Sequence, residues 1–351
     1  MKRNLRGFGK WVLLGTILLI PITMAWIVVS HPLPTGSSLA HSHRLPATQG
    51  VPNFVGSAQG YVWLDEKTVR QVNSVPVKTI DIKDTDVETG RVRKVASYPK
   101  GKETGYVADQ LTHLSPDRKW ILYSGFNVHT MMALTGKPFS IQIPLDTKLV
   151  LGQSITILQR AAWMPDSLHW LELSEDKSGN SVLLLHALDG KTAQRFVVPG
   201  AAQWRTLLGL TARGTALLEM NTANSGHTAH MKFLEVDLKT GQCMENAALN
   251  KVPSLQEAEM FTPTLSPHGD RIAWATRHNP DIVTNFARMF RHKPQTARYE
   301  IWSCRLDGSQ VHCADRVECQ GRDEVEMTNW LPDNKRISFA FRDTFYIVPA
   351  D

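Results

Sequence analysis

The chain has 351 residues, of which 42% are hydrophobic and 21% charged, values typical of a globular protein with one large domain or two ordinary ones. Its net charge is +6, but the first thirty residues carry four basic side chains and no acidic one, which leaves +2 for the remainder. This distribution argues against a nucleic-acid-binding surface, so we expect no nucleic-acid partner.

The N-terminal segment predicts a membrane anchor. Residues 1–10 form a basic stub, and residues 11–29 contain no charge and carry tryptophans near both ends. That apolar length approaches the roughly 20 residues with which a helix crosses a bilayer. The positive-inside rule then places the stub in the cytoplasm. A cleaved signal peptide is the alternative, and both interpretations put the rest of the chain outside the cytoplasm, in a bacterial periplasm or on the outer surface of the cell.

Residues 30–50 are rich in Pro, Ser, Thr and His, a composition typical of a linker. As a flexible chain it would hold the folded domain about 25 Å from the membrane. We therefore expect a single folded domain over residues 51–351, separated from the membrane by this linker.

A short phrase of an apolar residue followed by Ser-Pro-Asp, or a variant of it, recurs along residues 63–333. Its copies are Trp63-Leu64-Asp65, Leu114-Ser115-Pro116-Asp117, Met164-Pro165-Asp166, Leu210-Thr211-Ala212-Arg213, Leu265-Ser266-Pro267-His268 and Leu331-Pro332-Asp333. Six copies between Asp65 and Asp333 give a repeat of about 54 residues, and β-forming residues follow most copies. Proline suits a connection between strands, and the aspartates can accept hydrogen bonds from backbone N–H groups of the same turn. We therefore interpret Asp65, Asp117, Asp166 and Asp333 as structural turn residues, not as a catalytic set.

A second phrase alternates with the first and predicts a hairpin in each repeat. It occurs as Leu188-Asp189-Gly190, Val236-Asp237-Leu238-Lys239-Thr240-Gly241 and Leu306-Asp307-Gly308, where glycine supplies the positive φ of a tight turn. One turn and one hairpin per repeat give four antiparallel strands. The sequence thus predicts an all-β protein, a β-propeller of about six four-stranded blades.

These phrases resemble those of the TolB-type propellers, whose blades carry a Ser-Pro-Asp-Gly turn, an apolar strand and a later Gly-containing hairpin. The resemblance covers roughly residues 59–351 and is clearest at 113–124, 264–276 and 329–340. No copy here has the complete Ser-Pro-Asp-Gly, the copy at 210–213 lacks both Pro and Asp, and His268 replaces the aspartate of its copy. The resemblance implies the propeller fold and a role in binding.

The last repeat is too short for four strands, because only one strand can follow Phe341. An incomplete blade would expose a sheet edge. We expect an early segment near Asn53-Phe54-Val55 to supply the missing outer strand and close the ring. Trp63, Trp163 and Trp330 precede the turn in their repeats, and we expect them to pack between blades.

One segment breaks the repeat. Residues 279–294 predict a helix that begins at Asn279-Pro280 and ends before Pro294. Its apolar and basic side chains recur at helical spacing: Ile282, Phe286, Arg288, Met289, Phe290, Arg291 and Lys293. The helix is either a lid with its apolar stripe on the blade edge or a docking element for a protein, an anionic envelope polymer or the outer membrane leaflet. In the second case Phe286, Arg288, Met289, Phe290, Arg291 and Lys293 bind the partner.

The four cysteines suit an exported protein. Cys304 and Cys313 flank the turn at Asp307-Gly308, so we expect them to lie opposite each other, either as a disulfide or as free thiols. Cys243 and Cys319 have no partner that the sequence assigns.

The sequence contains no G-x-S-x-G, phosphate-binding loop, H-E-x-x-H or EF-hand pattern. His227 and His230 lack neighbouring ligands, so we expect no metal and no cofactor. The favoured function is a non-catalytic binding or scaffold module that acts on an envelope protein or polymer. The alternatives are an envelope enzyme, such as a glycan-active lyase or hydrolase with its site in the channel, and a structural subunit of a transport or secretion assembly.

Overall fold

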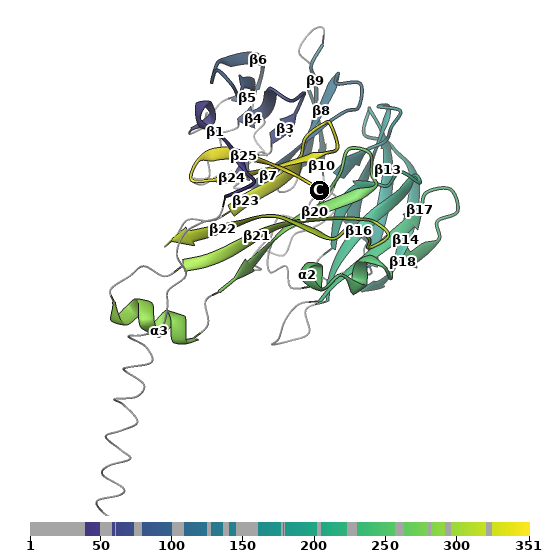
Figure 1. Cartoon of the computed structure of the whole chain (residues 1–351). Coiled ribbons are helices and arrows are strands. Elements are labelled where there is room, and N and C mark those ends of the chain that lie inside the picture. Colours follow the sequence, from purple (N-terminus) through teal and green to yellow (C-terminus); the bar gives the residue numbers. More distant parts are fainter. Residues whose placement is uncertain are drawn as a thin grey trace, which may run out of the picture.

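The computed structural model describes residues 39–49, 58–59, 61–73, 79–99, 109–124, 128–135, 140–144, 161–176, 178, 180–201, 205–222, 230–256, 263–279, 282–291, 296–320 and 325–351. These residues form six antiparallel β-sheets that follow one another along the chain (Figure 1). Each sheet contains four consecutive antiparallel strands joined in a meander, with two exceptions: the last sheet takes one strand from the N-terminal part, and the second carries a fifth, short parallel strand. The protein is a six-bladed β-propeller, as the repeat predicts.

The blades are numbered here in chain order. Blade 1 holds β3 (Tyr61–Trp63), β4 (Thr68–Asn73), β5 (Thr79–Asp86) and β6 (Val92–Pro99). Blade 2 holds β7 (Asp109–Leu114), β8 (Trp120–Ser124), β9 (Val128–Ala133) and β10 (Ser140–Pro144), with β2 (Ala58–Gln59) parallel to β7. Blade 3 holds β11 (Ala161–Trp163), β12 (His169–Glu175), β13 (Asn180–Ala187) and β14 (Thr192–Ala201).

Blade 4 holds β15 (Arg205–Leu210), β16 (Thr215–Thr222), β17 (His230–Asp237) and β18 (Cys243–Glu245), followed by the 3-10 helix η2 (Leu249–Lys251) and the short helix α2 (Pro253–Gln256). Blade 5 holds β19 (Thr264–Leu265), β20 (Arg271–His278), β21 (Thr296–Arg305) and β22 (His312–Gln320), with helix α3 (Ile282–Phe290) between β20 and β21. Blade 6 holds β23 (Val325–Trp330), β24 (Arg336–Phe341), β25 (Thr344–Pro349) and β1 (His43–Leu45), and the 3-10 helix η1 (Pro46–Thr48) follows β1.

Strand β1 closes the ring by pairing with β25, with His43 opposite Ile347 and Leu45 opposite Phe345. The turn after β1 is fixed by Thr48, whose Oγ1 accepts the N–H of Phe345 at 3.0 Å. An early segment thus completes the last blade as expected, but the strand lies at residues 43–45. The expected residues Asn53-Phe54-Val55 lie outside the described part of the chain. The interpretation of residues 30–50 as linker is therefore wrong for its second half, which belongs to the propeller.

The repeated aspartates form the predicted turns. Asp65 accepts the N–H of Lys67 at 2.8 Å, and the carboxylates of Asp117, Asp166 and Asp333 accept equivalent bonds from the residues two positions later. The four side chains belong to turns of four different blades, so they do not form one cluster.

The tryptophans before these turns join neighbouring blades. Their indole N–H groups donate to the preceding blade: Trp63 to Ser338 Oγ at 2.7 Å, Trp163 to the His113 carbonyl at 2.9 Å and Trp330 to the Thr264 carbonyl at 3.0 Å. All three rings are buried, so the packing role predicted for them is confirmed.

The expected arrangement of Cys304 and Cys313 is wrong. A register shift in the β21–β22 hairpin places Cys313 opposite Trp302 and Ser303 opposite His312, so the two cysteines are not cross-strand partners. None of the four cysteines forms a disulfide.

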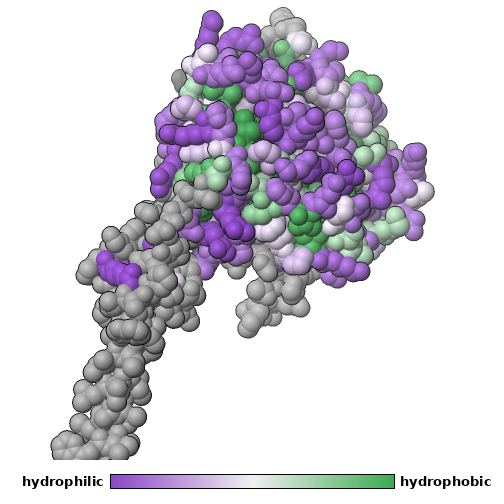
Figure 2. Space-filling model, viewed as in Figure 1, coloured by the Kyte–Doolittle hydropathy of each residue, from purple (hydrophilic) through white to green (hydrophobic). Residues whose placement is uncertain are grey.

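Within the described ranges, no helix is long and apolar enough to cross a membrane. Residues 1–38, including the proposed anchor at 11–29 and the stub at 1–10, lie outside those ranges. The face of the propeller in Figure 2 is mostly hydrophilic, with small separate apolar patches.

Candidate functional site

The candidate site lies where the repeat is most altered, in the turn between β15 and β16 of blade 4. Thr211 replaces the serine of other copies and keeps its function, because its Oγ1 accepts the backbone N–H of Thr215 at 3.3 Å. Arg213 stands where other copies have the turn aspartate. Because an arginine side chain is too long to cap its own turn, it is free to reach the neighbouring strand.

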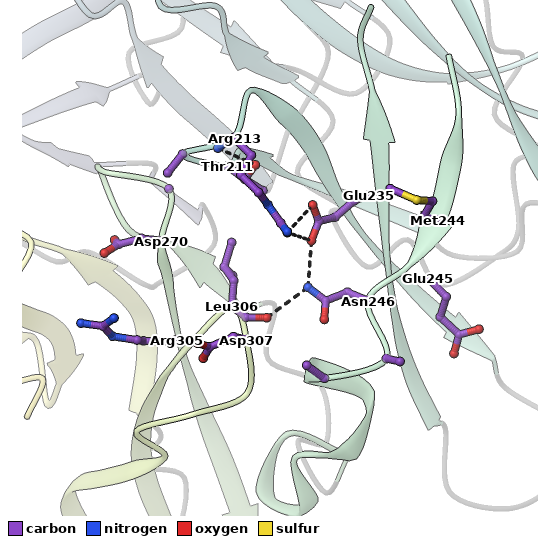
Figure 3. A pocket seen from close by; sticks show the side chains of 14 residues that line it. Thr211, Arg213, Glu235, Met244, Glu245, Asn246, Asp270, Arg305, Leu306 and Asp307 are labelled. Atoms are coloured by element: carbon purple, nitrogen blue, oxygen red, sulfur yellow. Dashed lines mark hydrogen bonds and ion pairs between the residues drawn. The ribbon is translucent and has the colours of Figure 1, made fainter. Parts of the chain in front are cut away.

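Arg213 reaches a buried carboxylate, that of Glu235 on β17. One guanidinium nitrogen of Arg213 lies 2.5 Å and 2.7 Å from the two oxygens of Glu235 (Figure 3). Thr215 Oγ1 donates to the same carboxylate at 2.8 Å, and Asn246 Nδ2 donates to it at 2.9 Å. Three donors thus surround the buried carboxyl group of Glu235, which compensates the cost of removing it from water.

Asn246 links this network to blade 5, since its Nδ2 also lies 3.1 Å from the Leu306 carbonyl in the β21–β22 hairpin. The opposite wall comes from the turn between β19 and β20, where Gly269 has φ +67°. A Cβ atom at this position would lie 2.4 Å from the Leu210 carbonyl oxygen. Only glycine allows the two turns to approach so closely, and the Ala212 N–H then donates to the Gly269 carbonyl at 2.7 Å.

At two other junctions a side chain fills the equivalent position. The Asp117 N–H donates to Ser167 Oγ of the next blade at 2.9 Å, and the His268 N–H donates to Asn334 Oδ1 at 3.2 Å. Between blades 4 and 5 this position is Gly269, which has no side chain. A cavity of about 550 Å³ lies between the turns of these two blades.

Charged and polar side chains line this cavity together with apolar residues, among them Met244 and Leu306 (Figure 3). Met244 is 50% exposed and offers apolar contact at the side of blade 4. The lining residues include two arginines, at 213 and 305, and four carboxylates, at 235, 245, 270 and 307. With all six groups ionised, the wall carries an excess of two negative charges.

The carboxylates of blade 5 are stabilised in their charged form. Burial raises the pKa of Asp270, but hydrogen bonds from Asn334 and Ser266 outweigh that effect and leave the pKa below its usual value. Hydrogen bonds from the Ser309 side chain and backbone lower the pKa of Asp307. Neither group can serve as a general acid near neutral pH, because each has already lost its proton there.

Helix α3 is present as predicted, and its described side chains separate into two faces. Arg288 is buried together with Thr284 and Ala287, whereas Met289 is 61% exposed. Burial raises the pKa of Glu318 on β22, and the positive charges of Arg298 and Arg288 partly offset this, which places Arg288 near the blade. Arg291 is half-buried. The side chains of Phe286 and Phe290, and all of Lys293, lie outside what the structure describes.

A second polar cluster lies buried between blades 2 and 3. His186 Nε2 lies 3.0 Å from Glu172, and its ring stacks on Trp170 with centroids 4.3 Å apart. His129 contacts the same tryptophan edge-on at 5.1 Å. Among the described residues no group of three or more His, Cys, Asp or Glu side chains could hold a metal ion, and this cluster is a packed interface between blades. His227 lies outside the described residues.

The pocket residues were not among the sequence-predicted site residues. Two departures from the repeat mark this place in the sequence. The copy at 210–213 has lost both Pro and Asp and carries Arg213, and Gly269 directly follows the copy at 265–268, in which His268 replaces the aspartate. None of the predicted partner-binding residues of α3 lines the pocket.

The chain is similar to several solved structures, whereas its sequence matches no known family. No family model matches the chain, and no curated protein matches it in sequence. TolB from Agrobacterium tumefaciens is a solved structure similar to this one, with 15% identity, 75% of this chain and 78% of that chain covered, and a TM-score of 0.47. TolB from Acinetobacter baumannii is 14% identical, with 81% of this chain and 64% of that chain covered and a TM-score of 0.46. The β-propeller domain of the Trilobed protease from Pyrococcus furiosus is 11% identical, with 81% of this chain and 79% of that chain covered and a TM-score of 0.43. The structures similar to this propeller include TolB proteins as well as a protease domain.

Proposed function

We propose that this protein is a membrane-anchored, extracytoplasmic β-propeller that binds a protein of the cell envelope without converting it chemically. The observation that carries the proposal is the cavity between blades 4 and 5. Its volume of about 550 Å³ falls within the range of ligand pockets, and its walls combine a methionine with fixed polar groups. A pocket of this size accommodates a side chain or short segment of a protein partner.

The charge of the cavity suggests which segment fits. The excess of carboxylates over arginines in the lining favours a segment with a basic side chain. Glu235 is already neutralised by Arg213 at 2.5 Å, so the carboxylates of blade 5 and Glu245 supply most of the attraction. Met244 supplies apolar contact next to these charges.

The state of the lining carboxylates supports binding over glycan cleavage. Glycosidases of the usual type need one protonated carboxyl group as general acid beside a second carboxylate. The pKa values of Asp270 and Asp307 are both lowered, and Glu235 is held by three donors. Among the lining residues there is also no histidine, serine or cysteine to act as a base or nucleophile.

Membrane anchoring is part of the proposal and rests on the sequence. Residues 11–29 are uncharged and follow a basic stub, so we infer a single span with the propeller outside the cytoplasm. Resistance of the full-length protein to carbonate extraction, with protease access only from the outer side, is the expected result. Release by carbonate would show that the segment is not an anchor.

The binding site is tested by capture from crosslinked native membranes. Met244→Asp places a charge on the exposed apolar part of the pocket and should reduce recovery of the bound protein about tenfold or more, as for a central contact residue. Val197→Asp, at a residue of blade 3 that is 54% exposed, is the matched control and should leave recovery unchanged. Equal recovery with both variants would exclude the pocket. Loss only on deletion of residues 279–294 would assign the partner to α3 instead.

A further inference from the structure

The N-terminal segment leaves the propeller at the end of blade 5 that carries α3. The Leu39 N–H donates to the Arg316 carbonyl at 3.1 Å, and the His41 N–H donates to Asp315 Oδ2 at 3.3 Å. Toward the N-terminus the chain therefore follows β22 in the direction of its last residue. That end of β22 pairs with the start of β21, which directly follows the α3 segment in the chain.

The chain between this exit point and the proposed anchor is short. Leu39 follows the end of the apolar segment, Val29, by ten positions. Fully extended, this stretch spans at most about 33–36 Å, and as a flexible coil it spans about 17 Å on average. The α3 end of blade 5 is therefore kept near the membrane surface, closer than a linker of residues 30–50 would allow.

The two faces of α3 differ from those of a lid. Thr284, Ala287 and Arg288 are buried, and their spacing puts them on one face of the helix. At about 100° per residue, the opposite face is the apolar stripe of the sequence, at positions 282, 286, 289 and 290. Met289, the described member of that stripe, is 61% exposed. A lid would bury this stripe, and Met289 is not buried.

Positive charge surrounds this helix. The described residues 276–279, 282–291, 296–300 and 316–320 contain five arginines and two glutamates, an excess of three positive charges. Arg298 and Arg316 both contact the buried Glu300, at 3.3 Å and 3.2 Å, yet their side chains remain 48% and 59% exposed. An apolar helix stripe flanked by arginines, with its described member Met289 exposed, is the pattern of a helix that lies in a membrane interface.

We propose that the apolar face of α3 and the neighbouring ends of β21 and β22 lie on the anionic phospholipid headgroups of the membrane that holds residues 11–29. This inference rests on the proposed anchoring. With contacts at both the anchor and α3, the propeller has a defined orientation on the membrane. The candidate pocket lies at the other end of β20, eight residues away along an extended strand, or about 25 Å. The pocket therefore faces away from the membrane, toward partners in the surrounding space.

The test uses the full-length protein in vesicles of phosphatidylcholine with or without phosphatidylglycerol. A photo-crosslinking amino acid replaces Met289 in one variant and Met244, which is 50% exposed on the pocket face, in a matched control. Carbonate extraction of each preparation reports on the anchor separately. We expect lipid adducts at position 289 several-fold above those at position 244, with a further increase when phosphatidylglycerol is present and a decrease at high salt.

The outcomes separate the two proposals. Adducts at 289 that equal those at 244, in protein that resists carbonate, would overturn the contact of α3 with lipid and leave the anchor in place. Release of the protein by carbonate would overturn the anchor and the lipid contact with it. Protein crosslinks at 289 in native membranes, without lipid adducts, would show that α3 binds a protein partner and would also overturn the lipid contact.

Discussion

Glu219 is the residue through which we expect pH to control the stability of the propeller. It lies on β16 with its side chain 6% exposed, on the same face of the strand as Leu217, which belongs to the apolar core between blades 4 and 5. One carboxyl oxygen has no hydrogen-bond partner, and burial raises the pKa of Glu219 to about 8 from an ordinary value of 4.5. The folded protein thus holds this proton more tightly than the unfolded chain does.

The direction of the pH effect follows from that difference. Below about pH 4.5 the group is protonated in both states and costs nothing through ionisation. As the pH rises toward 8, the unfolded chain gains the free energy of ionisation and the folded protein does not, so the free energy of unfolding falls. At 1.36 kcal/mol per pKa unit, the loss is about 3 kcal/mol at pH 7 and about 5 kcal/mol above pH 8.

The substitution Glu219→Gln removes the ionisation and keeps the shape. Urea denaturation followed by tryptophan fluorescence, at several pH values from 5 to 8.5, gives the free energy of unfolding of both proteins. The difference in free energy of unfolding between the variant and the wild type should increase by about 3–5 kcal/mol, in favour of the variant, as the pH rises from 5 to 8.5. Because the buried amide has a cost that does not depend on pH, the change with pH is the quantity to compare.

Glu245→Gln, at an exposed glutamate of the same blade, is the control and should follow the wild-type profile. Parallel profiles for wild type and Glu219→Gln, within about 0.5 kcal/mol over the whole range, would refute the reasoning. They would mean that Glu219 is ionised in the folded protein.

Three further changes test the contacts between blades and the state of the thiols. Gly269→Ala should lower the free energy of unfolding by about 2–4 kcal/mol, because a Cβ would lie 2.4 Å from a backbone oxygen of blade 4. Gly214→Ala, also at positive φ but in open space, should lower it by only about 1 kcal/mol. Similar losses for the two variants in denaturation would contradict the close approach. Ser338→Ala removes the acceptor of the Trp63 indole and should cost about 1–3 kcal/mol, and an unchanged denaturation midpoint would be evidence against that bond. Under denaturing, non-reducing conditions all four cysteines should react with an alkylating agent. In the folded protein Cys304 should resist alkylation, because burial raises its pKa to about 12. A disulfide-linked peptide in the mass spectrum would contradict this prediction.

The fold could be predicted because its signals are local and repeated. The turn phrase uses a proline and an aspartate that act within two residues, as the bond from Asp333 to the Lys335 N–H shows. Six copies of one phrase then fix the number of blades. Strand β1 could not be placed in the same way, because the three residues His43–Leu45 have no periodicity of their own. They form a strand only because β25 offers an unpaired edge.

The prediction that Cys304 and Cys313 lie opposite each other failed for a related reason. It assumed a regular hairpin between β21 and β22, but the register shifts between Ile301 and Trp302. A bulge of this kind depends on how the strand packs between its neighbours, and the spacing of Cys304 and Cys313 carries no information on it.

The pocket is a property of two blades together, which explains why neither copy of the repeat predicts it alone. Arg213 removes the capping carboxylate from the turn of blade 4 and adds a cation that holds Glu235. Gly269, in blade 5, lacks the side chain that Ser167 places at the equivalent position between blades 2 and 3. With a side chain at position 269 the two turns could not approach as closely, and without Arg213 the buried Glu235 would lose its cation. Paired departures from a propeller repeat, one in each of two successive copies, are therefore places where a binding site is expected.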